Sequence, residues 1–542
     1  MKSKYSVFAL LFGLFLFVPK SILAQKTVFE PTNESLKQYK TPEWFRDAKF
    51  GIWSHWGPQS VPERGDWYAR FMYLQGVLDW GENFDVNDSH TKRYGHPSEF
   101  GYKDLIPLFT AEKWDPEKLM KLYKKAGARY FVSMGQHHDN FDMWNSKLQP
   151  WNSVNMGPKR DVVKEWQDAA KKNGMPFGVS FHGEAAWGFF ESSRLSDHKG
   201  PFQGIPYDGW QTKEDGKGKW WEGYDPRDLY CQPHKPKLPA NVKAAEEVIR
   251  KGDPASDAFL DNFIGRVYDV LEQYQPELIY FDSGHFPAGK ERGTKLIADF
   301  YNMSQKWNNG INKAIVNGKH LTEEEQQMFM LDFENTHSSE VRKLPWQTDI
   351  GFDGWFYLEK EKEDYLSTQD MIHTLADIVS KNGNMLLNIT QSATGEIHPY
   401  AYQFLEEMGD WMEVNSEGIH GTRPWVKFGE GPSRIEGEKD IEHESIEYSS
   451  KDFRFTTKGN ALYAILMKYP EGKKEVTITS FSKNEKLWFG DIENVTLLGH
   501  KGHLKWKRTA SGLVVSLPKK APCDYAYIIK VSGSKKVGMK WQ

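Results

Sequence analysis

Residues 161–181 read DVVKEWQDAAKKNGMPFGVSF, a helical pattern that is followed at once by a strand-like run. Val162, Trp166 and Ala169 fall on one face at helical spacing, and Gly174 stands where a helix C-terminal cap is expected. The apolar run MPFGVSF then has the length of a buried strand. A helix and a strand joined this closely indicate one repeat of a parallel α/β fold.

The same alternation extends to both sides of this unit. Helical patterns recur at 115–127 and 368–383. Strand-like runs lie at 49–54, 128–134, 175–181, 277–281, 313–317, 328–333 and 384–389, with a weaker eighth run at 347–352. Eight such runs predict an α/β fold of the (β/α)8, TIM-like barrel type, with a doubly wound open sheet as the alternative.

The pattern of residues along the chain changes from about residue 417 onward. Short β-branched stretches such as EVTITSF and YAYIIKV are separated there by Gly, Lys, Pro and Asn, which predicts a C-terminal β-sandwich over 417–542. The barrel would then occupy 25–416. Its long polar insertion at about 189–232, with several Trp residues, is expected to reach over the active-site face and shape the leaving-group subsites.

The N-terminus carries the features of a secretory signal over 1–24. Lys2 and Lys4 precede a short apolar run, and the small-residue site Leu23-Ala24 comes before Gln25. We therefore expect an exported protein, periplasmic or secreted. The apolar run is too short to cross a membrane, so we expect no membrane span in the mature chain. The formal net charge of -4 argues against a nucleic-acid partner. Cys231 and Cys523 lie too far apart in sequence to indicate a disulfide framework or a cysteine metal site.

Polar residues end several of the apolar runs, where a barrel presents its catalytic groups. Asp282 follows LIYF directly, and because burying a charge is costly, a merely structural aspartate there is not the default reading. His137 and His138 follow the run at 128–134, and His55 follows the first run. Adjacent histidines point to opposite sides of an extended chain, so both enter a site only if the backbone bends.

The histidine pair has three readings. It could bind sugar hydroxyls, form structural hydrogen bonds, or ligate the metal of an exported metal-dependent hydrolase. No Cys or HExxH spacing accompanies the pair, which weakens the metal reading.

Seven segments together resemble glycoside hydrolase family 29, the α-L-fucosidases. They are WFRDAKFGIWSHWGPQSVP, GDWYARFMY, ARYFVSMGQHHDNFDMW, ELIYFD, PWQTDIG, SKNGNMLLNI and GTRPWVKFGEGP, spread in the family's order from Trp44 to Pro432. The resemblance implies a barrel with a C-terminal sandwich, no metal or other cofactor, a carbohydrate as the partner, and an exo-acting retaining reaction that releases terminal α-L-fucose by double displacement.

The resemblance also assigns roles to residues. It makes Asp282 the nucleophile and Glu334, in LDFENT, the acid/base, with Glu340 and Glu184 as alternatives. The predicted substrate-binding residues, three of which depart from the family pattern, are His55, Asp66, Trp67, His137, His138, His182, Lys319 and Trp355. Trp355 would pack near the C5 methyl group, although a core role fits it equally well.

Three departures from the family pattern concern the sugar pocket. Asp66 replaces a usual Glu, His182 lies in a strand that commonly carries Tyr and Ser, and Lys319 replaces a frequent Arg while losing its forked geometry. An α-L-galactosidase acting on algal galactan such as porphyran, including L-galactose sulfated at C6, is therefore an alternative. A non-catalytic carbohydrate-binding protein is an alternative of another class.

Overall fold

The computed structural model describes residues 27–79, 84–231, 254–358, 365–433, 441, 446–488 and 490–537, so the predicted signal lies outside the described residues. Eight parallel strands close a barrel in chain order. They are β1 (Phe50–Ser54), β2 (Tyr130–Gln136), β3 (Phe177–Phe181), β4 (Leu278–Gly284), β5 (Ile315–Lys319), β6 (Met330–Glu334), β7 (Trp346–Gly351) and β8 (Gly383–Asn388). Because β1 pairs with both β2 and β8, the barrel is confirmed and the open sheet is wrong.

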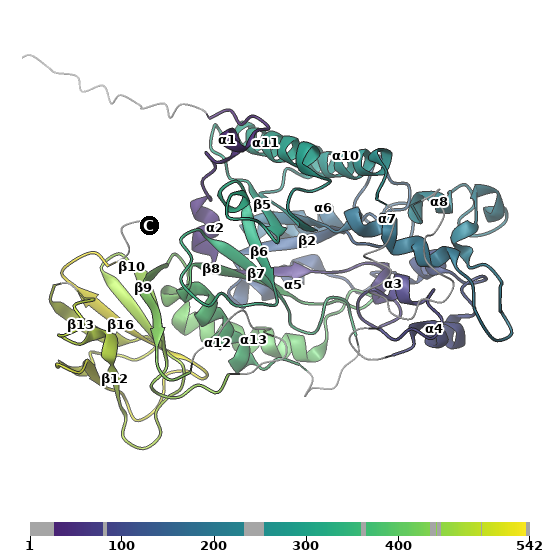
Figure 1. The fold of residues 1–542 in the computed structure, drawn as a ribbon. Helices are drawn as coiled ribbons and strands as arrows, with labels where there is room; N and C mark the ends of the chain where they lie inside the picture. The colour runs from purple at the N-terminus through teal and green to yellow at the C-terminus, as the bar shows by residue number, and fades with distance from the viewer. Residues whose placement is uncertain are drawn as a thin grey trace, which may run out of the picture.

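The helix that the sequence placed before β3 is α6 (Val162–Lys172). Asp161 caps its start by accepting a hydrogen bond from the Lys164 backbone N–H at 2.9 Å, and Gly174 follows its end at φ 67°. Trp166 is buried against the barrel. Among the described residues, the other helices of ten residues or more are α5 (Pro116–Lys125), α10 (Asp257–Tyr274), α11 (Lys290–Trp307), α12 (Thr368–Ser380) and α13 (Pro399–Asn415), and they lie around the barrel in Figure 1.

Two neighbouring connections of the barrel carry no α-helix. Residues 320–329, between β5 and β6, form one short 3-10 turn, η7 (Glu325–Gln327). Residues 335–345, between β6 and β7, form neither helix nor strand. The carboxyl ends of β5 and β6, where Lys319 and Glu334 stand, are therefore bordered by loops.

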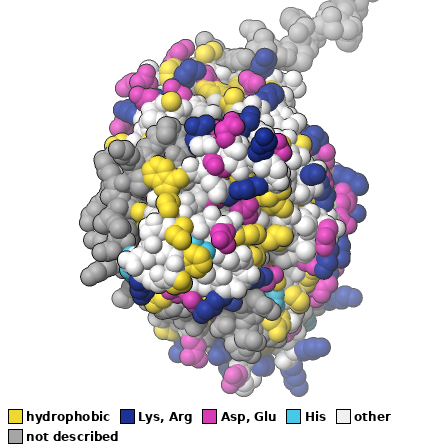
Figure 2. Space-filling model, turned by 90° about the vertical axis from the view of Figure 1, so that its right-hand side faces the viewer, with side chains coloured by type: hydrophobic (Ala, Val, Ile, Leu, Met, Phe, Trp, Pro, Cys, Tyr) yellow, Lys and Arg dark blue, Asp and Glu magenta, His cyan; other side chains and the backbone are white. Residues whose placement is uncertain are grey.

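Short helices gather at one end of the molecule, on the right in Figure 1. They include α3 (Tyr68–Phe71) and α4 (Val86–Tyr94) after β1, and α7 (Ala186–Phe189) and α8 (Pro226–Leu229) after β3. The Arg70 guanidinium donates a 2.7 Å hydrogen bond to the Phe189 carbonyl and so joins the two groups. Seen from this end (Figure 2), positive and negative side chains are interspersed.

The C-terminal region is a sandwich of two antiparallel sheets, as predicted. One sheet contains β9 (Arg423–Glu430), β10 (Phe453–Lys458), β11 (Ala461–Leu466), β16 (Tyr527–Gly533) and β13 (Ile492–Leu497), and the other contains β12 (Glu475–Ile478), β15 (Leu513–Ser516) and β14 (Lys505–Arg508). Both sheets contribute to one hydrophobic core, for example through Phe455 and Val515.

Three further sequence predictions concern this region and the chain as a whole. The predicted boundary between residues 416 and 417 lies between α13 and β9. Cys231 and Cys523 are both free thiols. Within the described part of the chain, no helix combines the length and apolar character that crossing a membrane requires.

Candidate active site

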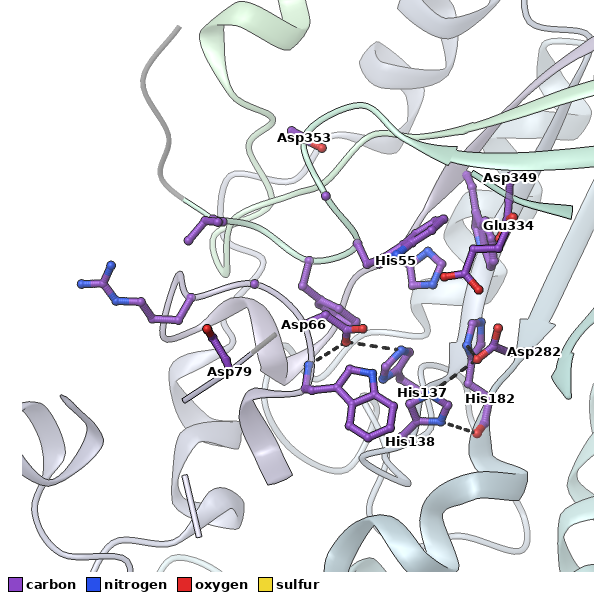
Figure 3. Close-up of a pocket in the computed structure, with 18 of the residues that line it drawn as sticks. His55, Asp66, Asp79, His137, His138, His182, Asp282, Glu334, Asp349 and Asp353 are labelled. Atoms are coloured by element: carbon purple, nitrogen blue, oxygen red, sulfur yellow. Dashed lines mark hydrogen bonds and ion pairs between the residues drawn. The ribbon is translucent and has the colours of Figure 1, made fainter. Parts of the chain in front are cut away.

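The carboxyl ends of the barrel strands surround one cavity of about 430 Å³. This volume lies in the lower part of the ~300–1,000 Å³ range of ligand pockets. All ten residues predicted from the sequence line it: His55, Asp66, Trp67, His137, His138, His182, Asp282, Lys319, Glu334 and Trp355. Figure 3 shows that carboxylates and imidazoles from separate strands and loops point into this one space.

Strand β4 presents Asp282 to the cavity. Its Oδ1 lies 2.6 Å from Lys319 Nζ, and its Oδ2 lies 3.2 Å from His182 Nδ1 and 3.5 Å from His138 Nε2. Burial alone would raise the pKa of Asp282, but the Lys319 ammonium and His182 outweigh burial and hold that pKa well below its usual range. The carboxylate is therefore ionised, the form in which it can act as a nucleophile.

Glu334 ends strand β6 and shares the same cation. Its Oε2 lies 2.7 Å from Lys319 Nζ, and its side chain is half exposed. Asp282 Oδ1 and Glu334 Oε2 both contact the Lys319 nitrogen. The distance between these two oxygens therefore cannot exceed the sum of their distances to that nitrogen. This agrees with the ~5–5.5 Å between the two carboxyl groups of a retaining glycosidase.

The two alternative acids do not line the cavity. Glu184 accepts a 3.1 Å hydrogen bond from the Ala288 backbone N–H instead, and it steadies the loop after β4. Glu340 is exposed in the 335–345 loop. Glu334 is the one of the three candidate glutamates that approaches Asp282.

The hydrogen bonds of the paired histidines limit what each ring can bind. The Nδ1 of His138 lies 2.8 Å from the His182 carbonyl oxygen, which only accepts, so Nδ1 carries the hydrogen. Burial lowers the pKa of His138 to about 4, so the ring is neutral at neutral pH. Its Nε2 then carries a lone pair that faces the cavity. His137 Nδ1 pairs with the Gln59 side-chain amide at 2.8 Å, and its Nε2 lies 3.7 Å from Asp66 Oδ1.

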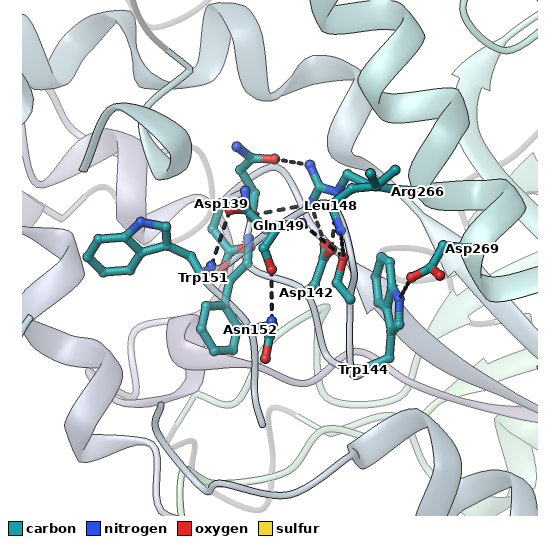
Figure 4. A network of polar contacts seen from close by, with 12 residues as sticks. Asp139, Asp142, Trp144, Leu148, Gln149, Trp151, Asn152, Arg266 and Asp269 are labelled. Carbon is teal, nitrogen blue, oxygen red and sulfur yellow. Dashed lines mark hydrogen bonds and ion pairs between the residues drawn. The ribbon is translucent and has the colours of Figure 1, made fainter. Parts of the chain in front are cut away.

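Both histidines enter the cavity because the backbone turns after β2. That strand ends at Gln136, and Asn140 has a φ of +59°. Arg266 of α10 fixes the turn: its guanidinium donates to Asn140 Oδ1 at 2.6 Å and forms a buried ion pair with Asp142 (Figure 4). The bend that adjacent histidines require is thus supplied by a polar network outside the cavity.

Asp66 and Trp67 lie on the loop after β1. Asp66 Oδ1 accepts a 2.7 Å hydrogen bond from the Trp67 backbone N–H, and burial raises the pKa of Asp66 to about 8. The carboxyl group is therefore protonated at neutral pH and can donate as well as accept. The Trp67 ring packs edge-to-face against His138, with 5.3 Å between ring centroids.

An aromatic wall stands opposite these groups. The centroid of the His55 ring lies 4.0 Å from the centroid of the Trp53 ring and 5.2 Å from that of the Trp355 ring. Asn388, which sequence reasoning missed, orients both sides of this wall. Its Oδ1 accepts from the His55 backbone N–H at 2.9 Å, and its Nδ2 donates to the Trp355 carbonyl at 3.0 Å. Trp355 is half-buried: it lines the cavity and also packs against a hydrophobic cluster that includes Trp53 and Tyr280, so its position is compatible with both expected roles.

A pair of buried aspartates beneath Lys319 was also missed. Asp349 lines the cavity with Oδ2 3.7 Å from Lys319 Nζ. The Tyr280 hydroxyl bridges it to Asp332, at 3.0 and 3.1 Å. Burial raises the pKa of Asp349 well above its usual range and that of Asp332 to about 6, so the pair retains a proton at neutral pH. Asp349 lies in the segment PWQTDIG, near the end of strand β7. This position near the end of a strand was the sequence signal that could have identified Asp349 as a site residue.

Among the residues that the structure describes, two groups of possible metal ligands occur, both in this cavity. His55, His137 and His182 form one group, and His138, His182 and Asp282 form the other, with ligand atoms within 4.8 Å of one another. The Lys319 ammonium, 2.6 Å from Asp282, would repel a cation in the second group. In the first group, the buried His55 Nδ1 and His182 Nε2 have no hydrogen-bond partner among the described residues.

The insertion at 189–232 contacts residues of this cavity, because Phe189 packs against the rings of Trp67 and His138. None of its described residues lines the cavity. Trp220 donates to Asp104 at 2.9 Å, and its ring contacts that of Trp151. Its polar, Trp-rich composition thus reflects packing on the loop region around residues 101–151.

Known proteins resemble the chain over most of its length. The model of the family described as alpha-L-fucosidase matches residues 16–417, and that of the alpha-L-fucosidase C-terminal domain matches 445–532. An alpha-L-fucosidase of Branchiostoma floridae is 27% identical, covering 93% of this chain and 96% of its own, and the tissue alpha-L-fucosidase of Bos taurus is 28% identical, covering 94% and 92%.

Solved structures agree on the fold. The Thermotoga maritima alpha-fucosidase has a TM-score of 0.68 at 24% identity, covering 93% of this chain and 100% of its own. Alpha-L-fucosidase isoenzyme 1 of Paenibacillus thiaminolyticus has a TM-score of 0.59 at 19% identity, with the same coverage. The L-galactosidase and non-catalytic alternatives find no support among these proteins. Because the first family model spans the whole barrel and all ten predicted site residues, the chain belongs to the α-L-fucosidase family, whose members are glycoside hydrolases.

Proposed function

We propose that the protein is an exo-acting, retaining α-L-fucosidase that removes terminal α-L-fucose from oligosaccharides or polysaccharides. Asp282 is the nucleophile, and Glu334 is the acid/base. The observation that carries the proposal is the bridge that Lys319 Nζ makes between these two carboxylates at the cavity, at 2.6 and 2.7 Å.

The two carboxyl groups take different parts in the proposed reaction. Glu334 donates a proton to the glycosidic oxygen while an Asp282 oxygen bonds to the anomeric carbon, and the leaving group departs as an alcohol. Glu334, now ionised, then takes a proton from water, which attacks the anomeric carbon and releases Asp282. Lys319 supports the resting state by helping to keep Asp282 ionised, because its ammonium and His182 together outweigh the effect of burial on the pKa of Asp282.

The cavity offers both kinds of hydrogen-bonding group to a sugar. His138 Nε2 is an acceptor for a hydroxyl group, and protonated Asp66 is a donor. Trp355 supplies an apolar face for the C5 methyl group. The lining supports recognition of a single terminal sugar, which is the basis for the exo-acting assignment.

The leaving group lies on the side of Glu334. A second cavity of about 360 Å³ shares Lys319 and Glu334 with the first. It is also lined by His320, Gln326, Phe333, Thr336 and Arg342, among others. We place the leaving group there rather than on the 189–232 insertion.

The test is hydrolysis of p-nitrophenyl α-L-fucoside, and of fucosylated oligosaccharides if this aryl substrate is inert, with the product followed by NMR. We expect α-L-fucose to appear before mutarotation. First formation of β-L-fucose would contradict the retaining mechanism, and no release from any substrate would contradict the function. Loss of activity with a chelator, restored by a divalent metal, would instead support the metal-dependent reading.

Export is a separate part of the proposal. It rests on the signal-like pattern at 1–24, with Lys2 and Lys4 before the apolar run. N-terminal sequencing of protein secreted or recovered from the periplasm should begin at Gln25. An unprocessed intracellular protein would contradict it.

A further inference from the structure

The loop at 335–345 begins directly after Glu334. Asn335 takes a left-handed conformation, with φ +46°, and the Thr336 hydroxyl donates a 2.6 Å hydrogen bond to the Glu334 carbonyl oxygen. The Asn335 backbone N–H donates to the Asp349 carbonyl at 2.8 Å. The direction in which Glu334 leaves its strand therefore depends on how this loop is held.

The loop is held by a buried ionic cluster. His337 Nδ1 lies 3.1 Å from Asp377 Oδ2 on α12. Asp377 also accepts from Lys381 Nζ at 2.7 Å and from Arg454 Nε at 2.6 Å. All four side chains are at most 7% exposed. The two cations hold the pKa of Asp377 well below its usual range although burial raises it, so Asp377 only accepts and His337 Nδ1 donates.

Arg454 brings the C-terminal sandwich into this cluster. It lies on β10, and its guanidinium stacks over Tyr448, 5.2 Å from the ring centroid. Phe428 of β9 covers both cations, with Lys381 Nζ 4.7 Å and the Arg454 guanidinium 5.5 Å from its ring centroid. The aromatic rings of Tyr448 and Phe428 thus hold Arg454 and Lys381 in place, and these two cations in turn bind Asp377.

Two further contacts connect the same loop to its surroundings. The Ile441 backbone N–H donates to the Asn335 carbonyl at 2.7 Å, which is a direct bond from the C-terminal region to the residue after Glu334. The Arg342 backbone N–H donates to the Lys381 carbonyl at 3.2 Å. The loop is therefore tied near its start and near its end.

We propose that the C-terminal sandwich positions the acid/base Glu334 through the chain of contacts Arg454–Asp377–His337. His337 and Arg454 are positioning residues: neither lines the cavity, and each acts through the loop that orients Glu334. The inference rests on the acid/base role given to Glu334 above. A displaced acid slows protonation of the glycosidic oxygen, and a small displacement of a reacting group can cost up to ~10²-fold in rate.

The experiment compares two fucosides in the full-length protein, one with a poor leaving group and one with an activated aryl leaving group. His337→Leu removes the donor to Asp377, and His337→Asn keeps an N–H near the position of Nδ1. Arg454→Lys keeps the charge on the sandwich side but not the guanidinium. Tyr525→Phe is the matched control, because the Tyr525 hydroxyl makes a separate sandwich-to-barrel bond with Glu407 at 2.7 Å.

We expect His337→Leu and Arg454→Lys to slow kcat/KM for the poor leaving group about tenfold and for the activated one less than about twofold. His337→Asn and Tyr525→Phe should behave as wild type on both substrates. Azide should raise the rate of His337→Leu on the activated substrate, as it should for Glu334→Ala.

Equal slowing on both substrates, or no slowing in either variant, overturns the inference. If His337→Leu does not fold, Arg454→Lys decides alone. Glu334→Ala is measured in parallel: if it lacks the leaving-group difference, the acid/base assignment itself fails. If it shows the difference and the positioning variants do not, only the inference fails.

Discussion

The ammonium nitrogen of Lys319 lies 2.6 Å from the Asp282 carboxylate, and the same nitrogen contacts Glu334 at 2.7 Å. One cation at the end of β5 thus joins two carboxylates from the ends of β4 and β6. Because burial alone would raise the pKa of Asp282, the ionised nucleophile depends on this contact and on His182.

Replacing the cation should shift the pH dependence of the reaction. In Lys319→Met, the pKa of Asp282 rises, so the nucleophile becomes protonated at a higher pH. The acidic limb of kcat/KM, which reports the free enzyme, should move to higher pH. Lys319→Arg, which keeps the charge, should leave that limb nearly in place. An unmoved limb in Lys319→Met would contradict this role.

The aspartate pair beneath Lys319 gives a second prediction. Because burial raises the pKa of Asp349 well above its usual range, an amide of the same shape should replace it. We expect Asp349→Asn to keep kcat within about threefold and to melt near wild type. Asp349→Leu should lose about 1–3 kcal/mol of stability, because it leaves the Tyr280–Asp332 contact without its third member. Similar damage in both variants would argue against a protonated Asp349.

Asp66 should couple stability to pH with a defined sign. Its pKa is about 8 in the folded protein against about 3.9 in the unfolded chain. The folded state therefore retains the proton longer, and its stability from this group is complete below about pH 4 and falls as the pH rises towards 8. Asp66→Asn cannot ionise, so its melting temperature relative to wild type should increase from pH 4 to pH 8. A constant difference would refute the raised pKa. Its KM should rise if Asp66 binds a sugar hydroxyl.

Glu334 should behave as an acid/base rather than as a binding group. Glu334→Ala should slow hydrolysis of poor leaving groups far more than that of activated aryl groups, because only the former need protonation. Azide should rescue the activated substrate and give α-L-fucosyl azide, since it attacks the covalent intermediate from the face opposite Asp282. Equal slowing on both substrates without rescue would remove Glu334 from this role.

The barrel and most of its site were predictable because a strand's period and its terminal polar residue are local signals. Asp282 follows four apolar residues, and Trp166 lies on a regular helical face. The missed residues act over long sequence separations. Asn388 joins His55 to Trp355, and its role depends on closure of the barrel between β1 and β8.

The contacts of the insertion at 189–232 were not predictable for a related reason. Its composition indicated an exposed polar segment with aromatic rings, but composition does not specify which surface those rings contact. Trp220 donates to Asp104, which no pattern within the insertion indicates. The ionic cluster of His337, Asp377 and Arg454 is likewise visible only when two domains are brought together.

The central claim is that Asp282 bonds to the anomeric carbon. The most direct measurement is to trap that bond with a 2-deoxy-2-fluoro-α-L-fucosyl donor that carries an activated leaving group, followed by peptide mapping with mass spectrometry. We predict a single fluorofucosyl adduct on the peptide that contains Asp282, absent from Asp282→Ala. An adduct on another carboxylate, or continued turnover by Asp282→Ala, would contradict the account.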